Sequence, residues 1–368
     1  MGRGMNSAGS IAITGMGLAS SLGPDVRNAC AAARAGLSRA RALEFQVVNG
    51  EDNDLEPVTG HPIATMTEGF EGVGRILRIM QMGLADFEKT LASGRSENSG
   101  WFLALPDGGQ NRADDHMPHA AAWELDSPRV CAALRRFTDI SVIDRNVVLV
   151  NDGHASFVRA VHEAMHQLEA GRLDYCVVGA ADSLLDTGSL QYLFDQQRLK
   201  TSDNAVGMQP GEAGAFFLLE PLPSAKRHDA AILGVIASRS LGFDELHFHS
   251  KKPPDGRGLT QVINMLSGES ESQGPRWLIS DNNGEPYRAI EWGDAWTHIV
   301  GDHPDFQTAT VSYPALSFGD TRMASGAVAL CMALRGFAGG YAPAQQAIIL
   351  SSSDHGSRGG LLVQAFSS

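Results

Sequence analysis

Short, uninterrupted apolar runs alternate with helical stretches along this chain, and this alternation limits the possible folds more than any other feature. The apolar runs occupy residues 11–14, 146–150, 174–180, 214–220, 230–238, 276–280, 346–351 and 360–365. Apolar residues recur at helical spacing in residues 24–37, 75–92, 155–170, 257–267, 286–300 and 321–336. A continuous apolar run bounded by turn residues is typical of a strand buried on both faces. The alternation therefore predicts an α/β fold whose parallel or mixed sheets are covered by helices.

The charge balance and the cysteines narrow the class of protein. The chain carries 42 acidic and 29 basic side chains, a formal net charge of −13, and such a surface repels the phosphates of nucleic acids. No apolar run approaches the length of a membrane span, and the first ten residues lack the apolar core of a signal peptide. The four cysteines are far apart and form no CxxC pair. We therefore expect a cytoplasmic protein with reduced thiols that binds no nucleic acid.

Four segments carry patterns that occur together, in this order, in one known family. They are ITGMGLASSLG at residues 13–23, the segment from 149 to 220 with VVGAADS and PGEAGA, then SFGDTRMASGAVAL, and finally SSSDHGSRGGLLV. Together they resemble the β-ketoacyl synthase family of the thiolase superfamily. The match reaches both halves of the chain but is weak over residues 40–145.

The resemblance implies a thiolase-type α/β fold. Two pseudo-repeated halves would pack in a five-layer α-β-α-β-α arrangement, with residues 1–225 and 226–368 as the halves and an irregular insertion at about 40–145. The two central helices would lie at about 155–170 and 322–335. Members of this family are usually dimers, so we expect a homodimer or a heterodimer with a ketosynthase-like subunit.

The resemblance also locates the positions that perform condensation. The family uses a cysteine thiolate at a helix N-terminus, two histidines that stabilise developing charge, and a lysine that supports them. In this chain the nucleophile position is His154, the first histidine position is Ser280 followed by Asp281, the lysine position is Ala315, the second histidine position is Asp320, and the gating-loop phenylalanine position is His355. None of these residues matches the family, so the resemblance implies a member that has lost the condensing residues.

The cysteines of this chain do not replace the missing nucleophile. Cys176 falls in a predicted buried strand and Cys331 deep in a predicted helix, while Cys30 and Cys131 are far from the motif in sequence. A buried thiol is normally inert.

His154 allows two interpretations. It titrates near neutral pH, so it could be a new base that works with Asp320 or His355, and two histidines and a carboxylate could also bind zinc or iron. It could equally be a polar side chain at the start of a helix in a cleft that no longer works. The HExxH pattern at 162–166 does not indicate a zinc site, because it falls on the closely packed central helix.

These observations predict a ketosynthase-like protein without condensing activity. It would be a partner or acyl-binding subunit of fatty-acid or polyketide-type synthesis, would contact an acyl carrier protein or acyl-thioester, and would use no cofactor. Two alternatives stay open: a repurposed hydrolase or acyltransferase based on His154, and a scaffold protein in a larger assembly. The sequence does not decide whether the chain is an enzyme.

Overall fold

The computed structural model describes residues 10–48, 50, 53–91, 98–106, 125–268 and 276–367. Its strands are β1 (Ile11–Ser20), β2 (Arg41–Val48), β3 (Leu55–Gly60), β4 (Ser99–Ala104), β5 (Val147–Val150), β6 (Tyr175–Ser183), β7 (Glu212–Pro221), β8 (Gly234–Phe243), β9 (Trp277–Ser280), β10 (Thr310–Ser312), β11 (Gln346–Ser352) and β12 (Ser357–Gln364). The predicted apolar runs therefore form strands, and β8 begins four residues later than the run at 230–238.

The helices described are α1 (Val26–Arg34), α2 (Gly72–Glu88), α3 (Ser127–Phe137), α4 (Ser156–Glu169), α5 (Thr187–Asp195), α6 (Leu222–Arg227), α7 (Arg257–Gly268), α8 (Pro286–Asp302), α9 (Ala315–Phe318) and α10 (Ser325–Ala338). Six of the helices described match the predicted stretches, namely α1, α2, α4, α7, α8 and α10, and the sequence did not predict the other four. Among the residues described, no helix is both long and apolar enough to cross a membrane.

Ten strands form one mixed sheet in the order β10-β9-β11-β12-β8-β1-β7-β6-β4-β5. The sheet has two halves, β5-β4-β6-β7-β1 and β10-β9-β11-β12-β8, which meet where β1 pairs antiparallel with β8. Each half has its three outer strands parallel and its remaining neighbours antiparallel. The two halves thus have the same strand order and the same strand directions, which confirms the prediction of two pseudo-repeated halves.

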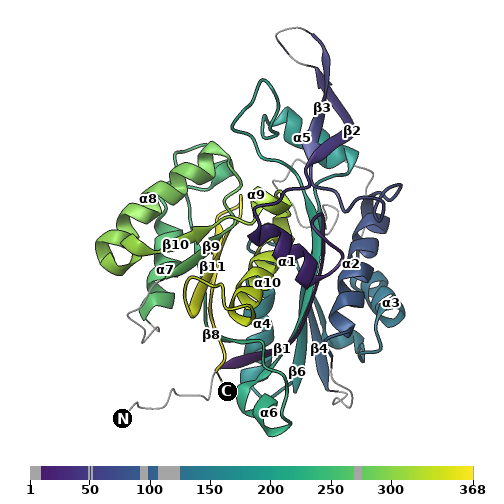
Figure 1. Ribbon diagram of the computed structural model, residues 1–368, viewed down its shortest axis with the longest axis vertical. Helices are drawn as coiled ribbons and strands as arrows, with labels where there is room; N and C mark the ends of the chain where they lie inside the picture. The colour runs from purple at the N-terminus through teal and green to yellow at the C-terminus, as the bar shows by residue number, and fades with distance from the viewer. Residues whose placement is uncertain are drawn as a thin grey trace.

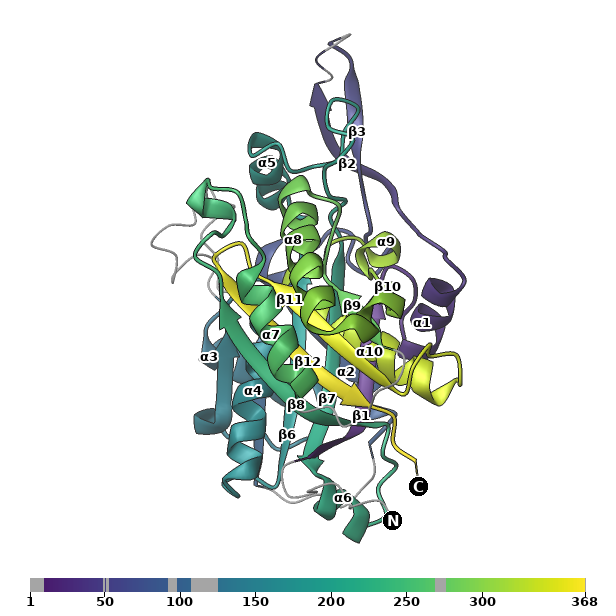
Figure 2. The same cartoon turned by 90° about the vertical axis from the view of Figure 1, so that its left-hand side faces the viewer.

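The layers follow from which helices cover which strands. Helices α4 and α10 lie between the two halves of the sheet, where α4 contacts strands of both halves and α10 contacts β11, β7 and β1 (Figure 1). Helices α2 and α3 cover the outer face of the first half, and α7 and α8 cover that of the second (Figures 1 and 2). This is the predicted five-layer α-β-α-β-α arrangement.

Small side chains let the central helices pack closely. Helix α10 begins Ser325-Gly326-Ala327-Val328-Ala329, and all five residues are buried. Across from it, Phe157 of α4 lies against Phe217 of β7, with ring centroids 5.5 Å apart. Bulky residues on α4 against small residues on α10 fill the space between the sheets at the density of a protein interior.

The stretch 40–145, expected to be an irregular insertion, contains more regular structure than its sequence indicates. Strand β4 lies inside the sheet, and α2 packs on β1, β7 and β6. Strands β2 and β3 form a separate antiparallel hairpin that projects from one end of the molecule (Figure 1). Their exposed and polar positions hide the strand pattern, because a hairpin with little buried surface needs few apolar residues. The proposed boundary between 225 and 226 falls within α6.

Candidate functional site

His154 lies in the turn between β5 and α4, close to the start of the central helix, and is 3% exposed. The turn depends on Gly153, whose φ is +55° and whose missing Cβ would lie 2.6 Å from Oγ of Ser353. A glycine is suited to this position both by its backbone conformation and by the close approach of the neighbouring loop.

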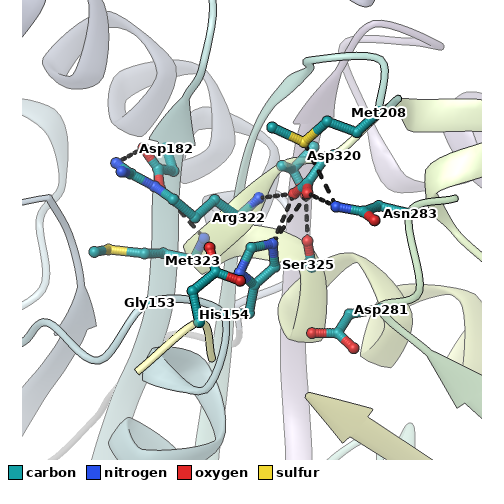
Figure 3. Close-up of polar contacts among 12 residues, drawn as sticks. Gly153, His154, Asp182, Met208, Asp281, Asn283, Asp320, Arg322, Met323 and Ser325 are labelled. Atoms are coloured by element: carbon teal, nitrogen blue, oxygen red, sulfur yellow. Dashed lines mark hydrogen bonds and ion pairs between the residues drawn. The ribbon is translucent and has the colours of Figure 1, made fainter. Parts of the chain in front are cut away.

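His154 and Asp320 form a buried pair. The Nε2 atom of His154 lies 2.9 Å from Oδ1 and 3.1 Å from Oδ2 of Asp320 (Figure 3). His154 comes from the first half of the fold and Asp320 from the turn before α10 in the second half. The structure therefore brings together the predicted nucleophile position and the predicted second histidine position.

Arg288 of α8 fixes the proton on the His154 ring. Its Nη2 atom lies 2.9 Å from Nδ1 of His154. A guanidinium group can only donate, so Nδ1 must accept and carry no proton. The proton of the neutral ring is therefore on Nε2 and is donated to Asp320. Both ring nitrogens are occupied, so this histidine has no lone pair left to act as a general base on a substrate.

Asp320 is surrounded by donors. Besides His154, it accepts from Nδ2 of Asn283 at 2.6 Å and from the backbone N–H of Arg322 at 2.7 Å. Burial alone would raise the pKa of Asp320, but His154, Arg288 and the amide of Asn283 hold it well below its usual range. Asp320 is therefore an ionised carboxylate that is held by hydrogen-bond donors of the protein itself.

Asp281 joins this set of contacts, whereas Ser280 has a local partner. Oδ2 of Asp281 accepts from the backbone N–H of Ser352 at 2.8 Å and from Nη1 of Arg288 at 3.3 Å. Ser280 is buried at the end of β9, and its Oγ accepts from the backbone N–H of Asn282 at 3.3 Å. Asp281 thus connects the loop after β9 to α8 and β11, and Ser280 fixes the start of that loop.

The network continues through the turn between β11 and β12. Asp354 accepts from Nη2 of Arg288 at 3.0 Å and from Nη1 of Arg198 at 2.8 Å. Arg198 also holds Glu285 through two hydrogen bonds of 2.6 and 2.8 Å. Burial would raise the pKa of Asp354, but the two arginines hold it well below its usual range. We call His154, Asp281, Glu285, Arg198, Arg288, Asp320 and Asp354 the buried charge network.

The structure gives His355 a different neighbour. Its ring stacks on that of His249, with centroids 4.5 Å apart and planes inclined by 23°. Ala315, the predicted lysine position, is the first residue of α9 and lines a groove beside Asn283.

Sequence reasoning missed Arg288, Arg198, Asn283 and Asp354, which hold the predicted residues in place. Arg288 looked like an ordinary residue of an amphipathic helix. The one available signal was the number of acidic residues in the loops at 281–285 and 354, since buried carboxylates need cationic partners.

The arrangement supports neither of the two metal interpretations. Within the residues that the structure covers, no group of three His, Cys, Asp or Glu side chains is placed to hold a metal ion. His162 and His166 of the HExxH pattern lie on α4, where burial lowers the pKa of His162.

The cysteines are buried and unpaired, as expected. Burial raises the pKa of Cys30 to about 12, and it holds those of Cys176 and Cys331 well above the usual value. A protonated, enclosed thiol is a poor nucleophile.

The low pKa of Asp320 predicts how the stability of the folded protein depends on pH. Its carboxyl has a lower pKa in the folded protein than the value of about 3.9 in an unfolded chain, so its stabilising effect is complete above that value and is lost as the pH falls. We expect Asp320→Asn to flatten the decline of stability below about pH 5 by up to about 1.4 kcal/mol per pH unit. Urea unfolding between pH 7 and pH 3 measures this slope.

Asp255→Asn is the matched control, because Asp255 pairs with the exposed Arg257 on the surface. The plot of its unfolding free energy against pH should run parallel to that of the wild type. The interpretation of Asp320 fails if the Asp320→Asn curve also runs parallel to the wild type.

Comparison with known proteins places the fold. No protein-family model matches the sequence, and no curated protein matches it either. Solved structures do match. One is a chain of AntDE:AntF, a type II PKS acyl-carrier protein in complex with its ketosynthase, at 14% identity and a TM-score of 0.77, covering 97% of this chain and 99% of that one.

Two further structures agree with the first. The ishigamide ketosynthase/chain length factor matches at 17% identity and a TM-score of 0.77, covering 97% of this chain and 99% of that one. The ketosynthase from module 6 of the bacillaene synthase of Bacillus subtilis 168 matches at 13% identity and a TM-score of 0.74, covering 97% of this chain and 72% of that one. Identities this low establish the architecture and leave the activity open. The protein has the thiolase-type fold of the ketosynthases.

Proposed function

We propose that this protein is a non-condensing, ketosynthase-like subunit that binds a partner or an acyl chain in fatty-acid or polyketide-type synthesis. The proposal rests on the burial and the hydrogen bonds of His154. The residue at the nucleophile position is enclosed, and both of its ring nitrogens are engaged by Arg288 and Asp320. A ketosynthase fold with this site keeps its shape and surfaces but lacks a group that can take an acyl chain.

A groove beside the buried charge network supports binding of an acyl-thioester. Its volume is about 460 Å³, which is within the range of small-molecule sites. Amides of Gln209, Asn282 and Asn283 line it, and Lys200 supplies a positive charge that suits a phosphate group. Val206 and Leu316 are 56% and 75% exposed at its edge and offer apolar contact.

The edge of the sheet supports association with a second subunit. Strand β5 is the last strand of the first half, and Val148 on it is 37% exposed. An edge strand presents unpaired backbone N–H and C=O groups that can pair with another chain. One structure of similar fold is a ketosynthase/chain length factor, and another contains an acyl-carrier protein with its ketosynthase. A partner of the same fold and a carrier protein are therefore the partners that we propose.

The test is affinity purification of the tagged protein from its native cells, followed by mass spectrometry. We expect a ketosynthase-like subunit or an acyl carrier protein to accompany it. Leu316→Asp should reduce recovery of the carrier protein at least tenfold, because a charge at the groove disrupts apolar contact.

Phe243→Asp is the matched control, since Phe243 is 58% exposed and does not line the groove. It should recover the carrier as well as the wild type does. Recovery of neither partner by the wild type would refute the proposal.

A further inference from the structure

A second cavity lies at the other end of β7 from His154. The start of β7 is at the His154 site, because the backbone N–H of Gly211 donates to the carbonyl of Asp320 at 2.8 Å. Glu220 is eight residues further along β7 than Glu212, and a strand rises about 3.4 Å per residue, so the two glutamates are about 27 Å apart. The cavity around Glu220 is therefore separate from the buried charge network.

The cavity has the composition of a small-molecule site. Its volume is about 650 Å³, within the range of ligand pockets. Leu168, Leu173, Leu218 and Pro223 provide apolar walls from two parts of the chain, 168–173 and 218–223. A pocket with mostly apolar walls and a few convergent polar groups is the usual form of a ligand site.

Glu220 is the buried charged group of this cavity. It is 5% exposed, its Oε1 accepts from the hydroxyl of Thr14 at 2.8 Å, and its Oε2 lies 2.7 Å from Nε2 of His228. An ionised carboxylate offers about four acceptor positions, and these two donors use two of them. Glu220 can therefore accept further hydrogen bonds inside the cavity.

His228 is a weak counter-charge for Glu220. Its side chain is 53% exposed and pairs with Glu220 from the surface, whereas the side chain of Glu220 is 7% exposed. A buried carboxylate is tolerated only when it is paired and hydrogen-bonded, and Glu220 keeps acceptor positions beyond those that Thr14 and His228 use. A cationic ligand in the cavity would bind at these positions, and the apolar walls would contact its hydrocarbon part.

We propose that the Glu220 cavity binds a small organic ammonium ion, with the ammonium group on the Glu220 carboxylate and the alkyl part against the leucines. This site is independent of the function proposed for the His154 face.

The experiment compares n-butylammonium with n-butanol, which has the same alkyl chain and no charge. Saturation-transfer NMR titrations of the full-length protein, at constant ionic strength, give both affinities. We expect the wild type to bind butylammonium at least tenfold more tightly than butanol. Glu220→Gln should remove this preference, since the amide keeps the shape but loses the charge.

Glu163→Gln is the control, because Glu163 lies on α4 and does not line the cavity. It should keep the wild-type preference. Equal binding of the two probes by the wild type overturns the proposal without any variant. Equal butylammonium affinity of Glu220→Gln and the wild type, with both folded by circular dichroism, also overturns it.

Discussion

Replacing Arg288 by methionine is expected to lower the free energy of unfolding by at least about 3 kcal/mol. Arg288 is 4% exposed and contacts Asp281, Asp354 and His154. Methionine fills part of the volume but offers no donor, so two carboxylates lose a cation and Nδ1 of His154 loses its hydrogen bond. Removing one member of a buried ion pair usually costs about 3–5 kcal/mol, because the partner stays buried without compensation.

Urea unfolding at pH 7 measures this loss, and Arg257→Met is the matched control. Arg257 forms an ion pair with Asp255 on the surface, where its side chain is 82% exposed. Its replacement should change stability by less than about 0.5 kcal/mol. Similar losses in the two variants would show that the buried charge network contributes no more than a surface pair.

Gly17→Ala is expected to be the second severe change, with a loss of about 3 kcal/mol or failure to fold. A Cβ at Gly17 would lie 2.1 Å from the backbone nitrogen and 2.4 Å from the Cα of Phe87. These are backbone atoms of α2, so no side-chain rotation relieves the clash. The helix would have to move away from β1, and a close-packed interior resists such movement.

The same substitution at Gly74 is the control for Gly17→Ala. Gly74 lies in α2, where an added Cβ meets only the ring of Phe70, at 3.8 Å. Alanine is the better helix former, so Gly74→Ala should raise stability by up to about 1 kcal/mol. Thermal unfolding of both variants gives the comparison, and a Gly17→Ala protein as stable as the wild type would show that α2 is not tightly held on β1.

The sequence was sufficient for the fold where side chains are buried on both faces. Strands such as β6 and β11 read as continuous apolar runs because helices cover both of their faces. The β2–β3 hairpin was missed for the opposite reason, since most of its positions are exposed or half-buried. The apolar pattern of a sequence indicates which residues are buried, so it does not reveal strands or helices that bury little surface.

The site was predictable only in part. His154 and Asp320 were identified from motif positions, and the structure brings them together. The chemical role of this pair depends on Arg288. Arg288 lies 134 residues from His154 in sequence, and only the tertiary fold brings the two into contact. Spacing along a chain cannot reveal which cation reaches a ring nitrogen, so the sequence left open whether His154 is a base.

The hydrogen bonds of His154 also limit how this sequence can change. A single His154→Cys substitution would provide the nucleophile of a condensing enzyme, but it would leave the carboxylate of Asp320 and the guanidinium of Arg288 without their shared partner. Asp320 would keep Asn283, and Arg288 would keep Asp281 and Asp354, so each charged group would lose one hydrogen bond. Such a bond is worth about 1.5–3 kcal/mol, against a total stability of about 5–15 kcal/mol. Under the function proposed here, a mutational route from this site to a condensing one would therefore lose stability at its first step unless neighbouring buried residues changed as well.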